Sequence, residues 1–282
     1  MGLVLTIYLF IKGKRVTVSF WPEALKIALP YIPHILSITV LRQMDRVMIT
    51  KICGERETAL YALAYNVATV VTLLQSSMNS AIGPWMAEKL AKKEHKQLRR
   101  YSKNYVVLFV YLALGLMLIS PEALWILGGK DYMGAKWVMI PVTLGLICQF
   151  MYSLFVNVEQ ITKNTIGMAF ASVSAAALNF VLNAWLIPKC GYIAASYTTL
   201  ISYLWLLLVH MWLVWKIGLS EVYSYRFMFW VVAVMAGVSG LVYLLYMVNL
   251  IRYTVIVLYV AITIIAIYKN KDMLFSLFKK SK

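Results

Sequence analysis

Charged residues are scarce in this sequence and make up only 13% of its 282 positions. A soluble domain usually has about a quarter of its residues charged. Hydrophobic residues account for 62% of the chain, which is more apolar surface than a single core surrounded by water could bury. These values exclude an ordinary water-soluble domain and indicate an integral membrane protein.

Acidic residues and cysteines are also few, with eleven Asp and Glu and three Cys in all. A membrane-embedded enzyme acting on polyprenyl substrates needs an acid, base or nucleophile held at a bilayer surface, whereas most of the acidic residues here are scattered among predicted loops. Cys53, Cys148 and Cys190 have no metal or redox spacing. We therefore expect no enzyme activity, no metal site and no cofactor.

Long uncharged runs recur along the chain, and roughly 20 apolar residues are enough to cross a bilayer core. Seven runs are candidate spans, at residues 58–87, 104–121, 137–158, 164–188, 190–215, 227–251 and 253–268. An eighth, at residues 27–52, contains two prolines and three charged residues. Residues 1–11 are apolar but reach only about 16 Å as a helix. The sequence predicts an all-α membrane protein with about eight transmembrane helices and a partial helix at its amino-terminal end.

Basic residues alternate between the two sides of these predicted helices. With residues 12–26 placed in the cytoplasm, the inner connections contain nineteen lysines and arginines and the outer connections contain six. Cytoplasmic loops of membrane proteins carry such an excess, so both termini are predicted to be cytoplasmic, in a multi-pass protein of the cell membrane. The net charge of +16 is explained by this orientation without a nucleic-acid partner.

Ionisable side chains at membrane depth are candidates for function because burying them is costly. Arg42, Asp45 and Arg46 fall within one helical turn of the eighth predicted span. One interpretation is a cationic site for pyrophosphate, since a guanidinium offers planar paired donors to phosphate oxygens. The alternative is an ion pair between Asp45 and one of the arginines near the outer end of the helix.

Polar side chains also recur on one predicted helix face, at alternating steps of four and three residues. The stripe comprises Tyr65, Thr69, Thr72, Ser76 and Asn79, and Asn66 and Gln75 flank it. A hydrated transport cavity for sugar hydroxyls explains this face, as do hydrogen bonds between helices. For Asn179 and Asn183, which follow two alanines at four-residue steps, helix packing is the favoured interpretation and substrate binding the alternative.

Four further residues are candidates for gating or coupling. Pro30 and Pro33 allow a helix to bend, although a packing kink alone would explain both. Glu159 and Lys163 are four residues apart at an inner boundary, where we expect a salt bridge, with gating or proton coupling as the alternative. His34 and His210 lack a metal constellation and are expected to be hydrogen-bonded core residues.

Several short motifs resemble one family of membrane proteins. They are Ala28-Leu29-Pro30-Tyr31-Ile32-Pro33-His34, Gln43-Met44-Asp45-Arg46-Val47-Met48-Ile49, Tyr61-Ala62-Leu63-Ala64-Tyr65, Pro84-Trp85, Leu178-Asn179-Phe180-Val181-Leu182-Asn183 and Gly191-Tyr192-Ile193-Ala194-Ala195-Ser196-Tyr197-Thr198-Thr199-Leu200. In their order and spacing they resemble the bacterial oligosaccharide flippases of polysaccharide synthesis, which are related to multidrug and toxic-compound extrusion (MATE) transporters.

The resemblance implies two six-helix lobes, followed by two extra helices, and alternating access for an undecaprenyl-pyrophosphate-linked oligosaccharide. This chain matches the carboxy-terminal lobe only, with residues 1–23 as a partial helix and connector, 24–217 as the lobe, and 218–282 as two further helices and a basic tail. A separate amino-terminal lobe or polysaccharide-assembly proteins are then the expected partners, besides the lipid bilayer. The alternatives are half of a drug or cation antiporter, a polyprenyl-dependent glycosyltransferase or polymerase, and an inactive truncated remnant.

Overall fold

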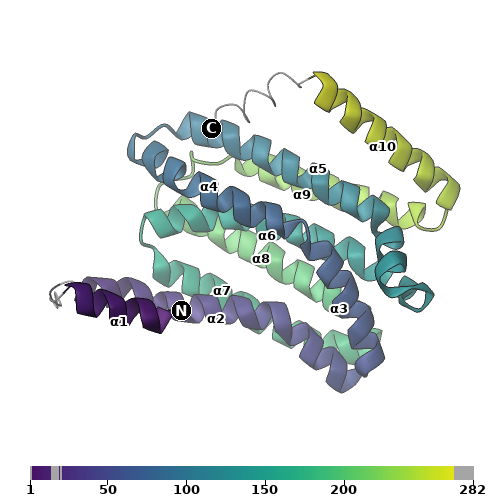
Figure 1. Cartoon of the computed structure of the whole chain (residues 1–282), viewed down its shortest axis with the longest axis horizontal. Helices are drawn as coiled ribbons and strands as arrows, with labels where there is room; N and C mark the ends of the chain where they lie inside the picture. Colours follow the sequence, from purple (N-terminus) through teal and green to yellow (C-terminus); the bar gives the residue numbers. More distant parts are fainter. Residues whose placement is uncertain (1, 14–18, 20, 270–282) are drawn as a thin grey trace.

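The structure is a computed structural model that describes residues 2–13, 19 and 21–269 (Figure 1). Within these residues the regular structure is helical, as the sequence predicts. In chain order the elements are α1 (Gly2–Gly13), α2 (Trp21–Ile52), α3 (Glu55–Thr69), α4 (Thr72–Ala91), α5 (His95–Gly128), the 3-10 helix η2 (Lys130–Ala135), α6 (Lys136–Ile161), α7 (Thr165–Cys190), α8 (Ile193–Lys216), α9 (Tyr225–Leu245) and α10 (Asn249–Lys269). The predicted basic tail beyond Lys269 lies outside the described residues.

Seven helical segments of the described chain are long and apolar enough to cross a membrane. They correspond to seven of the eight predicted spans, so the prediction of an all-α, multi-pass membrane protein is confirmed. α2 continues through Pro30 and Pro33 without interruption. α5 likewise continues through Pro121 to Gly128, where an outer loop had been predicted.

The predicted span at residues 58–87 is not one helix, and this expectation is wrong. The helix is interrupted at Val70 and Val71, between α3 and α4. Four β-branched residues in succession, from Thr69 to Thr72, lower the local helix propensity. The Thr69 and Thr72 hydroxyls also donate to the backbone carbonyls of Asn66 and Thr69, which provides the chain with an alternative to continued helical hydrogen bonding.

The centre of the bundle is α6. In its most apolar window 94% of the residues are buried, against 6% in the corresponding window of α10. α6 is mostly apolar, as expected for a helix that packs against α5, α8 and α9. Figure 1 shows α6 and α8 between α5, α4 and α9 on one side and α7 and α2 on the other, while α10 diverges from the bundle. The division at residue 217 remains a prediction.

Candidate functional site

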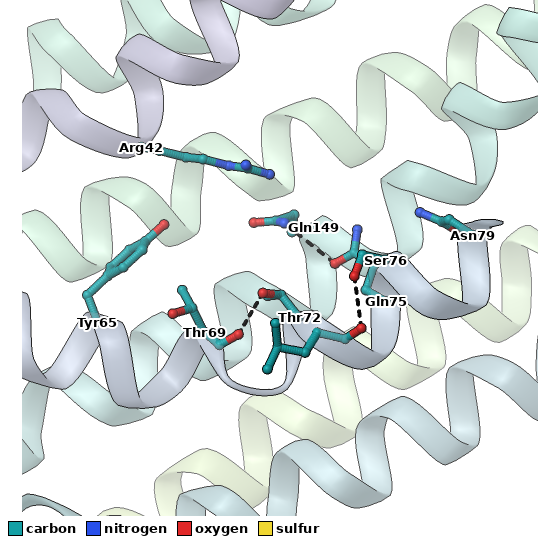
Figure 2. Close-up of a pocket in the computed structure, with 9 residues that line it drawn as sticks. Arg42, Tyr65, Thr69, Thr72, Gln75, Ser76, Asn79 and Gln149 are labelled. Carbon is teal, nitrogen blue, oxygen red and sulfur yellow. Dashed lines mark hydrogen bonds between the residues drawn. The ribbon is translucent and has the colours of Figure 1, made fainter. Parts of the chain in front are cut away.

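Polar side chains from four helices surround a cavity of about 400 Å³. α2, α3, α4 and α6 supply its lining residues Arg42, Tyr65, Thr69, Thr72, Leu73, Gln75, Ser76, Asn79 and Gln149. Figure 2 shows the Arg42 side chain extending across the cavity opposite the hydroxyl and amide groups. Nearly all of the predicted polar stripe is therefore brought together, although it lies on two helices instead of one.

The interruption between α3 and α4 shapes one wall of the cavity. Hydroxyl groups of this wall are tied to nearby backbone carbonyls, with distances of 2.6 Å from Thr72 to Thr69 and 2.9 Å from Ser76 to Leu73. These bonds place the oxygen atoms at the cavity surface (Figure 2). The wall therefore offers hydroxyl oxygens held in fixed positions to a ligand, in addition to the amide groups of Gln75 and Asn79.

A second group of amides, contributed by α6, was not among the predicted site residues. The Gln149 side chain is 3% exposed, and its Nε2 lies 3.5 Å from Oε1 of Gln75. Asn157, two turns further along α6, donates from Nδ2 to Oδ1 of Asn79 at 3.4 Å. The sequence did contain a signal for these residues. Gln149 and Asn157 are two amides in the largely apolar run at residues 137–158, and a buried amide needs a polar partner.

The two arginines of α2 have different surroundings. Arg42 lines the cavity beside Tyr65, whose hydroxyl lies 3.2 Å from that of Tyr203 on α8. Arg46 instead donates to Oδ1 of Asn66 at 2.9 Å, with its guanidinium 5.5 Å from the centre of the Tyr65 ring. Arg46 and Asn66 are therefore paired with each other outside the lining, and Arg42 is the cation that faces the cavity.

Asp45 does not form the ion pair that its spacing from the arginines suggested. Its carboxylate is almost fully buried and accepts hydrogen bonds from three other helices, namely from Tyr61 at 2.6 Å, Thr199 at 2.5 Å and Asn183 at 2.7 Å. Among the described residues, no arginine or lysine nitrogen lies within 4 Å of it. The alternative interpretation, an ion pair of Asp45 with one of the arginines, is therefore wrong, because α3, α7 and α8 supply donors to Asp45 on the inward face of α2.

The two asparagines of α7 belong to the same buried network. Asn183 donates to Oδ1 of Asn179 at 3.0 Å, and Asn179 lies 3.5 Å from the Thr199 hydroxyl. Both asparagines are buried and neither lines the cavity. The favoured interpretation, contact between packed helices, is thus confirmed, and the structure does not bring Asp45, Asn179 or Asn183 to the cavity.

The predicted salt bridge between Glu159 and Lys163 is also wrong. α6 ends at Ile161, and Lys163 has a positive φ of 59°, so the helical register that would align the two side chains is lost. Lys163 pairs with Glu23 at 2.7 Å, and the buried Glu159 pairs with His210 at 2.8 Å. His34 is a hydrogen-bonded core residue as expected, with Nδ1 3.2 Å from the carbonyl of Met168.

Comparison with known proteins finds several related membrane proteins and one family model that match this chain. A Haemophilus influenzae protein named for the Lsg locus is 30% identical over 46% of this chain and 33% of its own length. An uncharacterized membrane protein of the same organism is 27% identical over 47% of this chain and 33% of its length. The uncharacterized membrane protein MJ1068 of Methanocaldococcus jannaschii is 22% identical over 86% of this chain and 51% of its own length.

This chain thus spans between a third and about half of the length of these relatives. No solved structure matches it. The MatE family model matches residues 30–185, which contain the interrupted α3–α4 pair, the central helix α6 and all of the residues that line the cavity. Because the match covers more than half of the sequence, the chain belongs to the MatE family.

Proposed function

We propose that this chain is one lobe of a flippase that translocates an undecaprenyl-pyrophosphate-linked oligosaccharide across the cytoplasmic membrane. The cavity between α2, α3, α4 and α6 is its share of the substrate path. The lobe works together with an amino-terminal lobe, supplied by the rest of a longer protein or by a separate chain.

One observation carries this proposal, namely a polar cavity that is lined by a single arginine and opens between the helices of an apolar bundle. Hydroxyl and amide side chains can replace the water that surrounds sugar hydroxyls, and a hydrated surface at membrane depth must serve a ligand or face other helices. Arg42 offers a pyrophosphate paired, charge-assisted hydrogen bonds. The apolar exterior leaves the polyprenyl tail in the lipid while the polar headgroup crosses.

The size of the cavity supports the need for a second lobe. A volume of about 400 Å³ lies at the lower end of the range for small-molecule pockets, which is roughly 300–1,000 Å³. An oligosaccharide joined to a pyrophosphate exceeds this space. In transporters built from repeats the substrate site lies between the repeats, so the cavity is interpreted as one wall of a larger chamber.

Drug and cation antiport is the rival function within the same family. A carboxylate that faces the ligand attracts an organic cation, whereas the charged residue of this cavity is the cation Arg42. The nearby carboxylate of Asp45 is buried and receives three hydrogen bonds. The charge of the lining therefore favours an anionic, hydroxyl-rich substrate over a cation.

The test is rescue of polysaccharide export in cells that lack their own flippase, with and without a co-expressed amino-terminal lobe. Arg42→Gln is expected to reduce rescue at least about tenfold, since charge-assisted hydrogen bonds contribute about 1.5–3 kcal/mol. Arg46→Gln is the matched control, because this residue lies one turn further along α2 and does not line the cavity.

Membrane abundance of each variant is measured in parallel. Full rescue by Arg42→Gln at normal abundance would overturn the proposed role of this arginine. The antiporter would be favoured instead if the wild-type chain failed to rescue export both with and without the co-expressed amino-terminal lobe and if the cells exported cationic dyes.

A further inference from the structure

A second polar cavity lies where α5, η2 and α6 meet the turn between α9 and α10. Its volume is about 400 Å³, and its charged lining residues are Glu122, Lys136 and Arg252. This end of the bundle is predicted to face the exterior, so we call it the outer cavity. It shares no lining residue with the cavity around Arg42, and the proposed substrate path gives it no role.

The outer cavity has the residue types of a membrane–water interface. Trp125 on α5 and Tyr253 on α10 line it, and 55% and 48% of their surfaces are exposed. Tryptophan and tyrosine are enriched at the level of the lipid headgroups. On the predicted orientation, a lipid of the outer leaflet has its headgroup at this depth.

The charges that line the outer cavity do not balance. Arg252 is paired with Glu122, whose carboxylate lies 2.6 and 2.7 Å from its guanidinium. Lys136 is half-buried and has no acidic partner within 4 Å among the described residues. Its Nζ lies 3.5 Å from the carbonyl of Tyr246, which is long for a hydrogen bond from an ammonium group. The lining therefore has one cation in excess, which favours an anionic ligand.

An apolar groove of about 590 Å³ adjoins the outer cavity between α5, α9 and α10. Along each of these helices a groove residue lies about one turn closer to the membrane centre than a residue of the outer cavity. These neighbours are Leu118 with Glu122, Val242 with Tyr246, and Val255 with Arg252. Nη1 of Arg252 also donates to the carbonyl of Leu118 at 3.1 Å, so the two spaces meet at this contact.

The groove provides a surface for one hydrocarbon chain. Apart from Tyr259, whose hydroxyl donates to the carbonyl of Tyr111, its lining side chains are aliphatic. On α10 it extends from Val255 to Ile262, which is roughly 10 Å of helix. One leaflet of the hydrocarbon core is roughly 15 Å thick, so the groove ends within the leaflet in which it begins. An acyl chain fits this length, whereas a polyprenyl chain of many isoprene units exceeds it.

The helix beside the groove has little protein around it. α10 diverges from the bundle in Figure 1, and 6% of its most apolar window is buried. A hydrocarbon chain in the groove contacts α5, α9 and α10 together. The apolar surface that it covers contributes to holding α10 in place.

We propose that the outer cavity and the groove together bind one anionic glycerophospholipid of the outer leaflet as a resident lipid. Lys136 binds the headgroup phosphate, and Asn249 and Tyr253 line the space for the rest of the headgroup. One acyl chain lies in the groove. This lipid is not the transported substrate, and its binding does not depend on which substrate the protein carries.

The first test measures lipid binding by the purified chain in a neutral detergent. Native mass spectrometry follows the binding of dioleoyl-phosphatidylglycerol, which is anionic, and of dioleoyl-phosphatidylcholine, which has the same chains and no net charge. The wild type is expected to bind phosphatidylglycerol at least about tenfold more tightly, because an unbalanced cation at a partly buried site favours the anionic headgroup. Lys136→Gln should remove most of this preference.

Lys130→Gln is the matched control for the headgroup. Lys130 is an exposed lysine at the same end of the bundle, and it does not line the outer cavity. The two variants lose the same charge, so the difference between them reports the cavity and not the overall charge of the protein. Equal loss of preference in both variants, or no preference in the wild type, overturns the headgroup site.

The second test concerns the acyl chain. Leu241 on α9 lines the groove and is 61% exposed, so Leu241→Trp fills the groove from its open side without disturbing the core. It should weaken binding of dioleoyl-phosphatidylglycerol at least about tenfold, since each methylene group buried in the groove contributes to affinity. Binding of dihexanoyl-phosphatidylglycerol, whose chains are short, should change little.

Val234→Trp is the matched control for the groove. Val234 is exposed on α9 about two turns before Leu241 and does not line the groove. It should leave the binding of both lipids unchanged. Dioleoyl-phosphatidylglycerol that binds equally well to Leu241→Trp and Val234→Trp would contradict the assignment of the groove to an acyl chain.

Two further probes identify the source of the anion. Inorganic phosphate that displaces phosphatidylglycerol equally well from wild type and Leu241→Trp would assign the outer cavity to a free anion and overturn the lipid proposal. Undecaprenyl phosphate that binds more tightly than phosphatidylglycerol, and no longer binds to Leu241→Trp, would make the groove part of the substrate path and overturn a resident phospholipid. Failure of both probes to displace phosphatidylglycerol supports the proposal.

Discussion

The phenol of Tyr61 on α3 donates a hydrogen bond of 2.6 Å to the carboxylate of Asp45 on α2, and both side chains are almost completely buried. Thr199 and Asn183 donate to the same carboxylate from α8 and α7. Asp45 is thus the point at which four helices are joined by polar contacts. Its carboxyl oxygens are hydrogen-bonded to three donors from other helices, and among the described residues no lysine or arginine lies within 4 Å of them.

Replacement of Asp45 by leucine is expected to destabilise the protein. It leaves three buried donors without an acceptor, and each unpaired group costs about 1–3 kcal/mol. The apparent melting temperature in detergent, followed by size-exclusion chromatography after heating, should fall strongly, and it should fall less for Asp45→Asn. Gln43→Leu is the control, since Gln43 is exposed on the same helix. Equal stability of Asp45→Leu and Gln43→Leu would contradict the role of this network.

Substitutions of Gln149 are expected to change how strongly the cavity binds anionic and cationic ligands. Gln149→Leu removes one hydrogen-bonding group and should weaken binding of a pyrophosphate-linked sugar up to about tenfold, as one net hydrogen bond contributes about 0.5–1.5 kcal/mol. Gln149→Glu has nearly the same size but adds a carboxylate facing Arg42 across the cavity (Figure 2). It should weaken binding of the anionic substrate further and improve retention of organic cations.

Binding to purified protein by microscale thermophoresis measures both effects. We expect the affinity for the anionic substrate to be highest in the wild type, lower in Gln149→Leu and lowest in Gln149→Glu. An unchanged affinity in Gln149→Glu would place the substrate outside this cavity.

The sequence was sufficient for the fold class because transmembrane helices are defined by run length and hydrophobicity, which are local properties. The interruption at Val70 and Val71 was missed for an equally local reason. The polar stripe keeps its helical spacing across the break, so periodicity alone predicted one continuous helix, while the competing bonds of Thr69 and Thr72 to the backbone depend on side-chain rotamers.

Site residues were predictable where they share one stretch of chain and unpredictable where they meet over long separations. Arg42, Tyr65, Thr72, Gln75 and Asn79 line the cavity, and their proposed contact with substrate stays a prediction. The partner of Glu159 lies 51 positions away in the sequence, and a spacing rule could suggest only Lys163. Likewise the donors to Asp45 come from three other helices and could not be inferred from its neighbours.

The orientation in the membrane gives a further prediction. The basic connection at residues 89–103 should face the cytoplasm, and the outer turn at Lys130 should face the exterior. In a variant without its three cysteines, Lys130→Cys should react with an impermeant maleimide in intact cells, and Lys92→Cys should react only after lysis. Both side chains are exposed, so access to the reagent depends on the side of the membrane. Labelling of Lys92→Cys in intact cells would reverse the topology.

A buried ion pair joins the start of α10 to α5. Arg252 on α10 is buried and forms two short contacts with the carboxylate of Glu122 on α5, at 2.6 and 2.7 Å, and a third with the carbonyl of Leu118 at 3.1 Å. α10 is otherwise the least buried of the seven candidate spans, with 6% of its window inside the structure. Loss of the pair should therefore loosen the start of α10 while the central helices stay packed and the contacts of Tyr259 with Tyr111 remain.

Arg252→Gln is expected to make the turn between α9 and α10 at least about tenfold more sensitive to chymotrypsin. Without the ion pair, this turn should open locally more often and expose its backbone to the protease. Cleavage kinetics in membranes, analysed by mass spectrometry, measure this effect. Tyr253→Phe is the control, since it removes a single exposed hydrogen bond to Glu122 and leaves the arginine contacts in place. If Arg252→Gln is cleaved no faster than Tyr253→Phe, then the apolar contacts of Val242 and Tyr246 with α5 are what hold this end of the bundle together.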